Sequence, residues 1–355
     1  MKIFTDLHHV DLYHSLHLLF EKRLNFEIYR PICEKTWFNQ TEIPDFVKCG
    51  AWQIHNSCRM HDPVDYDLPM FHQYLTLGCG ENLIWNGYDR DQDIHKIYNP
   101  AHNYHSKCID LRTFKDMEFD IIMPTHTVHY KSFEKLLEFQ PKAKYVCHVG
   151  NSDVIIDNCE NVIHSVTYKS NNKNKVLVHQ ELDSNCYKHI EPNTNTKNLF
   201  AICQLYQYKE IYEEYKQHLT DLNMRYHGTN TPDGVLHGTP EVGKKMQEAN
   251  LAWSTKYWGG LGHTNMGWFY SGRALVTNMS EHYRQGGDTL DLFEPGYNCI
   301  DLDSNTTHEN CKLIREWMKP ENQLKYGNNA KKRFHEVINY DHEAENVKKF
   351  LENLI

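Results

Sequence analysis

The stretch WGGLGHTNMGWFYSGRALVT, residues 258–277, places glycines, tryptophans and a histidine ahead of a short apolar segment. Gly259, Gly260 and Gly262 allow positive φ angles and a close approach of another group to the backbone. A helix that begins near Thr264 would direct the free N–H groups of its first turn at a group above this loop. The stretch therefore predicts either a diphosphate-binding loop or a plain turn between a strand and a helix.

Neither of two common glycine motifs explains this loop. A Walker loop needs GxxxxGK[ST], which the stretch lacks, and no βαβ unit begins here as the dinucleotide motif GxGxxG requires. A phosphate site at this point would be of another type.

The second half of the chain alternates between apolar, strand-like segments and amphipathic helices. The expected strands are NLFAICQL, NMRYHG, LAWSTK, RALVT and FEPGYNCIDLD, and the expected helices cover residues 211–222, 241–250 and 306–338. In the closing segment DHEAENVKKFLENLI, Val347, Phe350, Leu351 and Leu354 fall on one helical face. This order is typical of a parallel α/β sheet.

The first half begins in the same way. The segment KIFTD predicts a strand, Asp11 is placed to cap a helix, and FEIYRP predicts the next strand. One face of that helix is apolar, formed by Leu12, Leu16, Leu19 and Phe20. Further strands are expected at residues 119–123, 144–149 and 161–167, with a helix at 131–139. Residues 33–113 predict irregular insertions with one or two strands.

A polar segment without apolar periodicity, residues 188–198, is the best candidate for a linker. We therefore expect an α/β fold of two Rossmann-like, doubly wound domains, with the boundary between them near residue 190.

Composition narrows the class of protein. The 355 residues carry a formal net charge of −9, so no basic domain indicates nucleic-acid binding. No apolar run approaches the ~20 residues of a membrane span, and the N-terminus does not have the pattern of a signal peptide, so we expect a cytoplasmic protein. The 11 cysteines form no CxxC pair, which predicts free thiols.

Ligands in open α/β sheets collect at the carboxyl ends of the strands. In the first half this rule selects the loop after the first strand and two later loops. Those loops contain Asp6, His8, His9, Thr125, His126 and residues 148–151. A histidine there could act as a general base. An alternative is a metal-dependent hydrolase in which Asp6, His8, His9, His126 and His148 hold the ion, although their spacing matches no established ligand motif.

The glycine stretch joins these observations to a known family. Gly272 ends the expected helix and ALVT continues into a strand, while GTPEVGKKMQEANLAW supplies the preceding helix and strand. In this arrangement the chain from Asn198 onward resembles the nucleotide-sugar-binding domain of GT-B glycosyltransferases. The resemblance implies that the glycine loop holds the donor diphosphate. It also implies that the two domains face each other across a cleft, with an acceptor-binding domain at 1–190, a donor-binding domain at 191–340, and a helix at 341–355 that packs back toward the first domain.

Residue by residue, the resemblance assigns a donor site and a catalytic loop. The implied donor-binding residues are Gln204, Tyr206, His227, Gly228, Glu241, Val242, Gly262, His263, Thr264, Asn265 and Met266. The implied catalytic residues are His9, His8 and Asp6, with His126, His148 and Asn151 on the acceptor side. Many retaining members carry a glutamate where this chain has Gly267, so the stereochemical outcome stays open.

The expected function is transfer of a sugar from a nucleotide sugar, a UDP-sugar in the first instance, to an acceptor hydroxyl. No permanently bound cofactor or metal is expected. The acceptor is a polysaccharide, a small molecule, or a hydroxymethylated base in DNA if a bacteriophage encodes the protein and it works in the host cytoplasm. The alternative within the same fold is an enzyme of the nucleotide-sugar 2-epimerase type.

Overall fold

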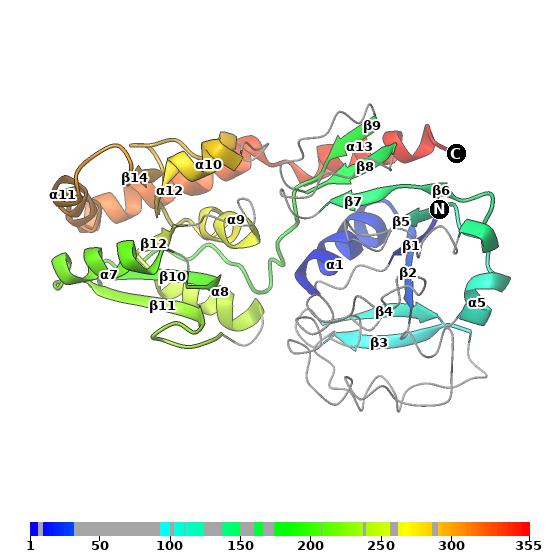
Figure 1. Cartoon of the computed structure of the whole chain (residues 1–355), viewed down its shortest axis with the longest axis horizontal. Coiled ribbons are helices and arrows are strands. Elements are labelled where there is room, and N and C mark those ends of the chain that lie inside the picture. Colours follow the sequence, from blue (N-terminus) through cyan, green and yellow to red (C-terminus); the bar gives the residue numbers. More distant parts are fainter. Residues whose placement is uncertain are drawn as a thin grey trace.

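The computed structural model describes two lobes that lie side by side (Figure 1). The described residues are 1–5, 10–31, 93–99, 103–109, 111–123, 137–149, 160–165, 174–206, 208–236, 239–255, 262–285 and 290–355. The first strand and the last helix belong to the same lobe, so both ends of the chain lie there (Figure 1).

The N-terminal lobe is built on a six-stranded sheet in the order β3-β4-β2-β1-β5-β6. Its strands are β1 Lys2–Thr5, β2 Glu27–Pro31, β3 His95–Asn99, β4 Tyr104–Ile109, β5 Ile121–Met123 and β6 Lys144–Tyr145. Every neighbouring pair is parallel except β3 with β4. The strands β3 and β4 lie within residues 33–113, where one or two strands were expected, and residues 32–92 lie outside the described residues.

The helix that follows β1 covers this sheet with the predicted apolar face. It runs as α1, Val10–His17, and continues as a π-helical segment η1, Leu18–Arg23. Leu12, Leu16, Leu19 and Phe20 are all buried in one core cluster with Ile3. The capping role of Asp11 is wrong, because α1 already includes Val10 and Asp11 lies inside the helix.

A second, three-stranded sheet divides what was predicted as one strand. Residues 144–149 form β6 and then β7, Cys147–Val149. β6 pairs with β5, whereas β7 pairs with β8, Asn161–His164, and β8 with β9, Asn174–Leu177. The apolar pattern of the segment gives no sign of this change of sheet, because both halves are strands. A short helix, α5 Leu111–Asp116, was not predicted.

The C-terminal lobe contains one five-stranded parallel sheet in the order β11-β10-β12-β13-β14. Its strands are β10 Asn198–Leu205, β11 Asn223–Thr229, β12 Leu251–Ser254, β13 Leu275–Thr277 and β14 Cys299–Asp301. Every expected strand of this half is confirmed.

Helices cover the sheet of the C-terminal lobe (Figure 1). They are α7 Lys209–His218, α8 Thr239–Glu248, α9 Gly262–Tyr270, α10 Met279–Gln285, η4 Leu290–Leu292, α11 Thr307–Trp317 and α12 Pro320–Val337. Two core clusters fill the spaces between helices and sheet. The described cysteines are free thiols, as expected.

The last helix, α13 Tyr340–Glu352, belongs spatially to the other lobe. Ala344, Val347 and Leu351 are buried in the same cluster as Ile3 and Phe20. The helix thus completes the N-terminal core. The three domain bounds given above remain predictions.

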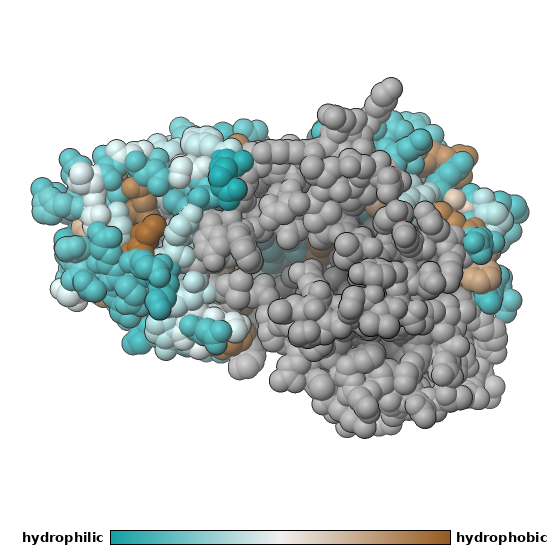
Figure 2. Space-filling view, viewed as in Figure 1, coloured by the Kyte–Doolittle hydropathy of each residue, from teal (hydrophilic) through white to brown (hydrophobic). Residues whose placement is uncertain are grey.

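Hydrophilic residues cover most of the C-terminal lobe on the face shown in Figure 2. Among the described residues, no helix combines the length and the apolar character that a membrane crossing requires.

Candidate functional site

The carboxyl ends of all five strands of the C-terminal sheet meet at one edge, since the strands are parallel. Buried polar side chains connect neighbouring strands at that edge. The hydroxyl of Thr277, the last residue of β13, donates to the backbone carbonyl of Ser254 at 2.6 Å and contacts Nε2 of His282 at 2.9 Å. Ser254, the last residue of β12, donates to Oδ1 of Asn265 in α9. The buried polar side chains at this edge are therefore held in place by hydrogen bonds.

Helix α9 lies over this edge and begins and ends at glycines with positive φ. Gly262 has φ +62° and Gly272 has φ +71°. After the helix, Arg273 N–H donates to Trp268 O at 2.9 Å and Gly272 N–H donates to Phe269 O at 3.0 Å. A glycine beyond the last turn allows this termination. The predicted role of Gly272 as the end of the helix is confirmed.

Asn265 links the first turn of α9 to the end of β12. Its side chain is fully buried, and Oδ1 accepts the hydrogen bond from Ser254. Its Nδ2 is also buried and has no hydrogen-bond partner within the described part of the chain. A buried amide without a partner costs about 1–3 kcal/mol. A ligand with acceptor oxygens at the start of α9 would remove that cost.

The position of the expected acid is filled by packing. A Cβ on Gly267 would lie 3.0 Å from Cε1 of Tyr187 and 3.1 Å from the sulfur of Met246. Tyr187 is 2 % exposed, and its ring also meets His263 edge-on at 5.3 Å. A side chain at 267 would press on Tyr187 and Met246, which would have to shift by a few tenths of an ångström to admit it. The close packing at this position thus favours glycine.

Near its carboxyl end, strand β11 closely approaches β10. The register shifts between Ile202 and Leu205 in β10, opposite Gly228. Gly228 has φ +154°, and a Cβ on it would lie 1.7 Å from the carbonyl oxygen of Cys203. Only glycine permits this approach.

His227, beside that glycine, is 8 % exposed. Burial lowers its pKa, with Lys245 and Arg225 also lowering it and Asp233 opposing them. Its Nδ1 is buried without a partner among the described residues. The ring is therefore neutral at pH 7 and can donate or accept one hydrogen bond to a ligand.

The other predicted donor residues lie around the same edge. Tyr206 follows β10, and its hydroxyl donates to Glu213 in α7, so this side chain is directed into its own lobe. Burial and that hydrogen bond raise its pKa. Glu241 and Val242 lie in the first turn of α8, where Glu241 is exposed and Val242 packs on the core. The backbone of Gln204 lies in β10.

The side chains at the start of α9 differ in how deeply they are buried. Met266 is 2 % exposed and belongs to the core. His263 and Thr264 are half-buried in the first turn of α9. The backbone of this turn and the half-buried side chains of His263 and Thr264 are therefore the exposed groups, whereas the side chain of Asn265 is fully buried.

The sequence analysis missed a contact that holds the loop after β10. Tyr208 adopts a left-handed conformation with φ +48°, and its hydroxyl donates to Oε1 of Glu281 in α10 at 2.7 Å. The other oxygen of Glu281 accepts from Nε of Arg284 at 2.7 Å. Burial and the contact with Glu281 raise the pKa of Tyr208 to about 12. The carboxyl-end rule, applied to Thr277 as well, would have identified this part of the edge.

Most N-terminal candidates lie outside the described residues. These are Asp6, His8, His9, His126 and Asn151. His148 is described: it lies in β7, is fully buried, and its Nε2 lies 2.9 Å from the hydroxyl of Ser165. Among the described residues, no group of three or more His, Cys, Asp or Glu side chains could hold a metal ion. Four of the five ligands of the metal alternative are not among them.

No protein-family model and no curated protein matches this chain. Solved structures do match over nearly its whole length. Sucrose-phosphate synthase from Thermosynechococcus elongatus has a TM-score of 0.61 at 9% identity and covers 99% of this chain and 98% of its own. A glycosyltransferase from Rickettsia africae ESF-5 has a TM-score of 0.60 at 8% identity with the same coverage. TarM has a TM-score of 0.56 at 11% identity, again with that coverage.

The chain has the GT-B glycosyltransferase fold. At these identities the likeness concerns the fold alone. It confirms the expected architecture of two Rossmann-like α/β units.

Proposed function

We propose that this chain is a glycosyltransferase that binds a nucleotide-sugar donor at the carboxyl edge of the C-terminal sheet. The observation that carries the proposal is the start of α9. There Gly262 has a positive φ, and Asn265 presents a buried amide nitrogen without a partner in the described chain. The GT-B fold supports the same reaction class.

The start of α9 suits a diphosphate on electrostatic grounds. The first backbone N–H groups of a helix lack internal partners, and the helix dipole places partial positive charge there. We assign Gly262, His263, Thr264 and Asn265 to the diphosphate, with only the backbone of Met266 contributing. These groups stabilise the leaving diphosphate without a metal ion.

We assign the nucleoside to the adjoining ends of β10 and β11. Gln204, Tyr206, His227, Gly228, Glu241 and Val242 surround this region. The neutral ring of His227 is a suitable hydrogen-bond partner for a base or ribose. TarM of S. aureus, in a structure with a TM-score of 0.51 to this chain at 12% identity, was solved with UDP. We therefore take a UDP-sugar as the first donor to test.

In the proposed reaction an acceptor hydroxyl attacks the anomeric carbon of the donor sugar. The new C–O bond forms, the bond from that carbon to the diphosphate oxygen breaks, and the hydroxyl proton passes to a base. We assign the base to His9, His8 or Asp6, which follow β1 in the sequence, with His126, His148 and Asn151 on the acceptor side. Holding both substrates between the lobes lowers the barrier mainly through positioning.

The acceptor is a polysaccharide, a small molecule or hydroxymethylated DNA. The acidic net charge of −9 disfavours DNA, because phosphate contacts require basic groups. A mobility-shift series with modified DNA at low and high salt separates these classes. Salt-dependent retention of the modified duplex would support the DNA acceptor.

The donor site is tested by Gly262→Val. A β-branched residue does not adopt φ near +60° without strain, so the helix start would move and donor binding should be lost. Gly296→Val is the matched control, because Gly296 also has positive φ, at +83°, in open space. Binding of UDP-glucose, UDP-GlcNAc and the corresponding GDP- and ADP-sugars is measured by calorimetry.

Retention of normal donor affinity in Gly262→Val would contradict the proposed site. Incubation of the wild-type protein with donor alone tests the other GT-B activity considered above. An epimerised sugar in that incubation would assign the protein to the epimerase class instead of transfer.

A further inference from the structure

The chain passes between the two lobes twice. The first crossing is the segment between β9 and β10, residues 178–197, and the second is the joint at Ile338 and Asn339 between α12 and α13. Helix α12 packs in the C-terminal core through Ala330 and Phe334, whereas α13 packs in the N-terminal core. Any change in the angle between the lobes must therefore occur at these two places.

The first crossing is attached to the C-terminal lobe by buried contacts. The guanidinium of Arg273 donates to the carbonyls of Ile190 and Gln247 at 2.8 and 2.9 Å. The side chain of Gln247 donates to the carbonyl of Cys186 at 3.3 Å. A Cβ on Gly243 would lie 2.1 Å from that same carbonyl oxygen, so the segment lies directly on α8.

The two crossings are attached to each other on the N-terminal side. Both oxygens of Glu343 in α13 contact His179, one at its backbone N–H and one at Nδ1, each at 2.7 Å. The hydroxyl of Tyr340 donates to the carbonyl of Gln180 at 3.3 Å. Residues 179–181 and the first turn of α13 therefore move together.

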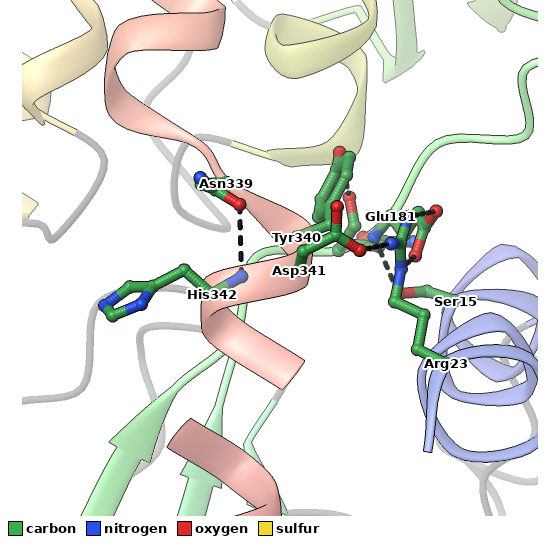
Figure 3. A network of polar contacts seen from close by, with 8 residues as sticks. Ser15, Arg23, Glu181, Asn339, Tyr340, Asp341 and His342 are labelled. Carbon is green, nitrogen blue, oxygen red and sulfur yellow. Dashed lines mark hydrogen bonds and ion pairs between the residues drawn. The ribbon is translucent and has the colours of Figure 1, made fainter. Parts of the chain in front are cut away.

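Arg23, at the end of η1, attaches this pair to the N-terminal lobe (Figure 3). Its Nε and one terminal nitrogen donate to the two oxygens of Glu181 at 2.9 and 2.7 Å. The other terminal nitrogen donates to Asp341, and the guanidinium carbon lies 5.7 Å from the centre of the Tyr340 ring. The hydroxyl of Ser15 accepts from the backbone N–H of Glu181 at 2.7 Å.

The two acidic partners of Arg23 contribute unequally. The side chain of Glu181 is 15% exposed and that of Asp341 is 89% exposed. Exposed ion pairs contribute little, whereas a bidentate, shielded arginine–carboxylate pair is stronger. The hydrogen bonds to Glu181, the largest cause, raise the pKa of Arg23. The contact with Glu181 is thus the main attachment.

A cavity of about 490 Å³ adjoins this attachment and is bordered by both lobes. Its described walls include His17 and Tyr104 from the N-terminal lobe and Tyr270 and Phe334 from the C-terminal lobe. The lobes are therefore not closely packed here. The relative position of the crossings depends on the polar contacts of Arg23 more than on apolar contact across the cavity.

We propose that Arg23 is a positioning residue that sets the angle between the two lobes by holding Glu181 and Asp341 at the two crossings. The proposal rests on the proposed function for its effect on catalysis, because transfer requires the donor lobe and the acceptor lobe to be aligned. Residues 183–185 and Asn339, which lie between the attachments to the two lobes, are the pivots.

The experiment measures the distance between the lobes by single-molecule energy transfer. Fluorophores are attached through unnatural amino acids at the exposed positions Lys142 and Lys312, so the native cysteines stay unmodified. Arg23→Gln should broaden the distance distribution, and Arg23→Lys, which keeps the charge without the bidentate geometry, should give an intermediate width. Glu181→Gln should broaden it more than Asp341→Asn.

Arg315→Gln is the matched control. Arg315 forms a comparable pair with Asp221 at 2.9 Å, but both residues lie in the C-terminal lobe. This variant should leave the distance distribution unchanged. If Arg23→Gln fails to fold, Arg23→Lys and Glu181→Gln still test the proposal, because each weakens the bidentate pair with a smaller change of side chain and should still broaden the distribution.

Steady-state kinetics supply the readout that a purely structural role would not give. Donor affinity should be unchanged in Arg23→Gln because the donor site lies within one lobe, while kcat for transfer should fall about tenfold through misalignment. An unchanged distance distribution in folded Arg23→Gln, or equal broadening in Arg315→Gln, would overturn the proposal. Broadening in a protein that transfers no sugar would refute the proposed function and leave the role of Arg23 intact.

Discussion

The two lobes obtain their cores in different ways. In the C-terminal lobe both core clusters come from one continuous part of the chain, from Leu182 to Ile338. In the N-terminal lobe the main cluster combines the first strand, Ile3, with the last helix, Val347 and Leu351. The C-terminal lobe can therefore form its sheet and its polar edge from contiguous sequence. The N-terminal lobe requires the end of the chain to return.

This difference teaches where flexibility and precision reside. The predicted donor site lies on a single sheet whose edge is fixed by Ser254, Thr277 and Asn265. Within the described residues, the N-terminal lobe is linked to that site through the two crossings and Arg23. The C-terminal lobe is thus preorganised for the proposed donor, and the N-terminal lobe is positioned relative to it.

The largest expected effect tests the dependence of the N-terminal core on α13. Leu351→Ala removes a fully buried side chain from that core and should lower the free energy of unfolding of this lobe by about 2–5 kcal/mol. Hydrogen exchange resolved by segment measures each lobe separately. The exposed neighbour provides the control, Glu352→Ala, which should change stability by less than about 0.5 kcal/mol. Equal loss of hydrogen-exchange protection in both lobes of Leu351→Ala would contradict the specific dependence of the N-terminal core on α13.

An intermediate effect tests the fixed edge of the donor lobe. Gly228→Ala places a Cβ against the carbonyl of Cys203 and should destabilise the C-terminal lobe by about 3 kcal/mol, combining overpacking with positive φ. Gly234→Ala, in the segment after β11 with φ +76° and open space around it, should cost only about 1 kcal/mol. Urea denaturation of both variants measures the difference. Similar values would show that the close approach to β10 is unimportant.

The smallest expected effect is a pH dependence of the stability of the C-terminal lobe. Burial lowers the pKa of His227, so the unfolded chain binds its proton first as the pH falls below about 6.5. Stability should therefore decrease as the pH falls from 7 toward the folded-state pKa. His227→Gln should flatten part of this decrease, leaving the contributions of His189 and His335, whose pKa values burial also lowers. The thermal midpoint of His227→Gln is measured between pH 7 and 5. A profile identical to that of the wild-type protein would contradict the contribution of His227. The control is His218→Gln, at an exposed position.

Local patterns were sufficient for most of the strands and helices. The segment NLFAICQL is β10 over its whole length, and the helix ending at Gly272 follows from the one residue that adopts the required φ. The division of residues 144–149 between two sheets was not predictable, because pairing partners are distant in sequence. The predicted cap at Asp11 and the predicted helix end at residue 222 differ by a few residues from the observed start of α1 at Val10 and end of α7 at His218. Local sequence signals define helix ends only to this precision.

The candidate site was only partly predictable. Asn265 was selected by its place in the glycine loop, but its burial and its unpartnered amide depend on the contact with Ser254. Tyr187, which fills the space above Gly267, comes from a segment some eighty residues earlier and carries no local signal. Arg23 resembles any surface arginine in the sequence.

By itself the sequence determined the α/β class, the glycine-initiated helix and the succession of strands along the second half of the chain. These features depend on periodicity and on residues with special backbone freedom. Only the tertiary structure decided which residues of the last helix pack with Ile3, that Gly267 lies against Tyr187 and Met246, and that Arg23 joins Glu181 to Asp341. Such contacts join residues far apart in the chain. They are set by how the elements pack, which no local pattern specifies.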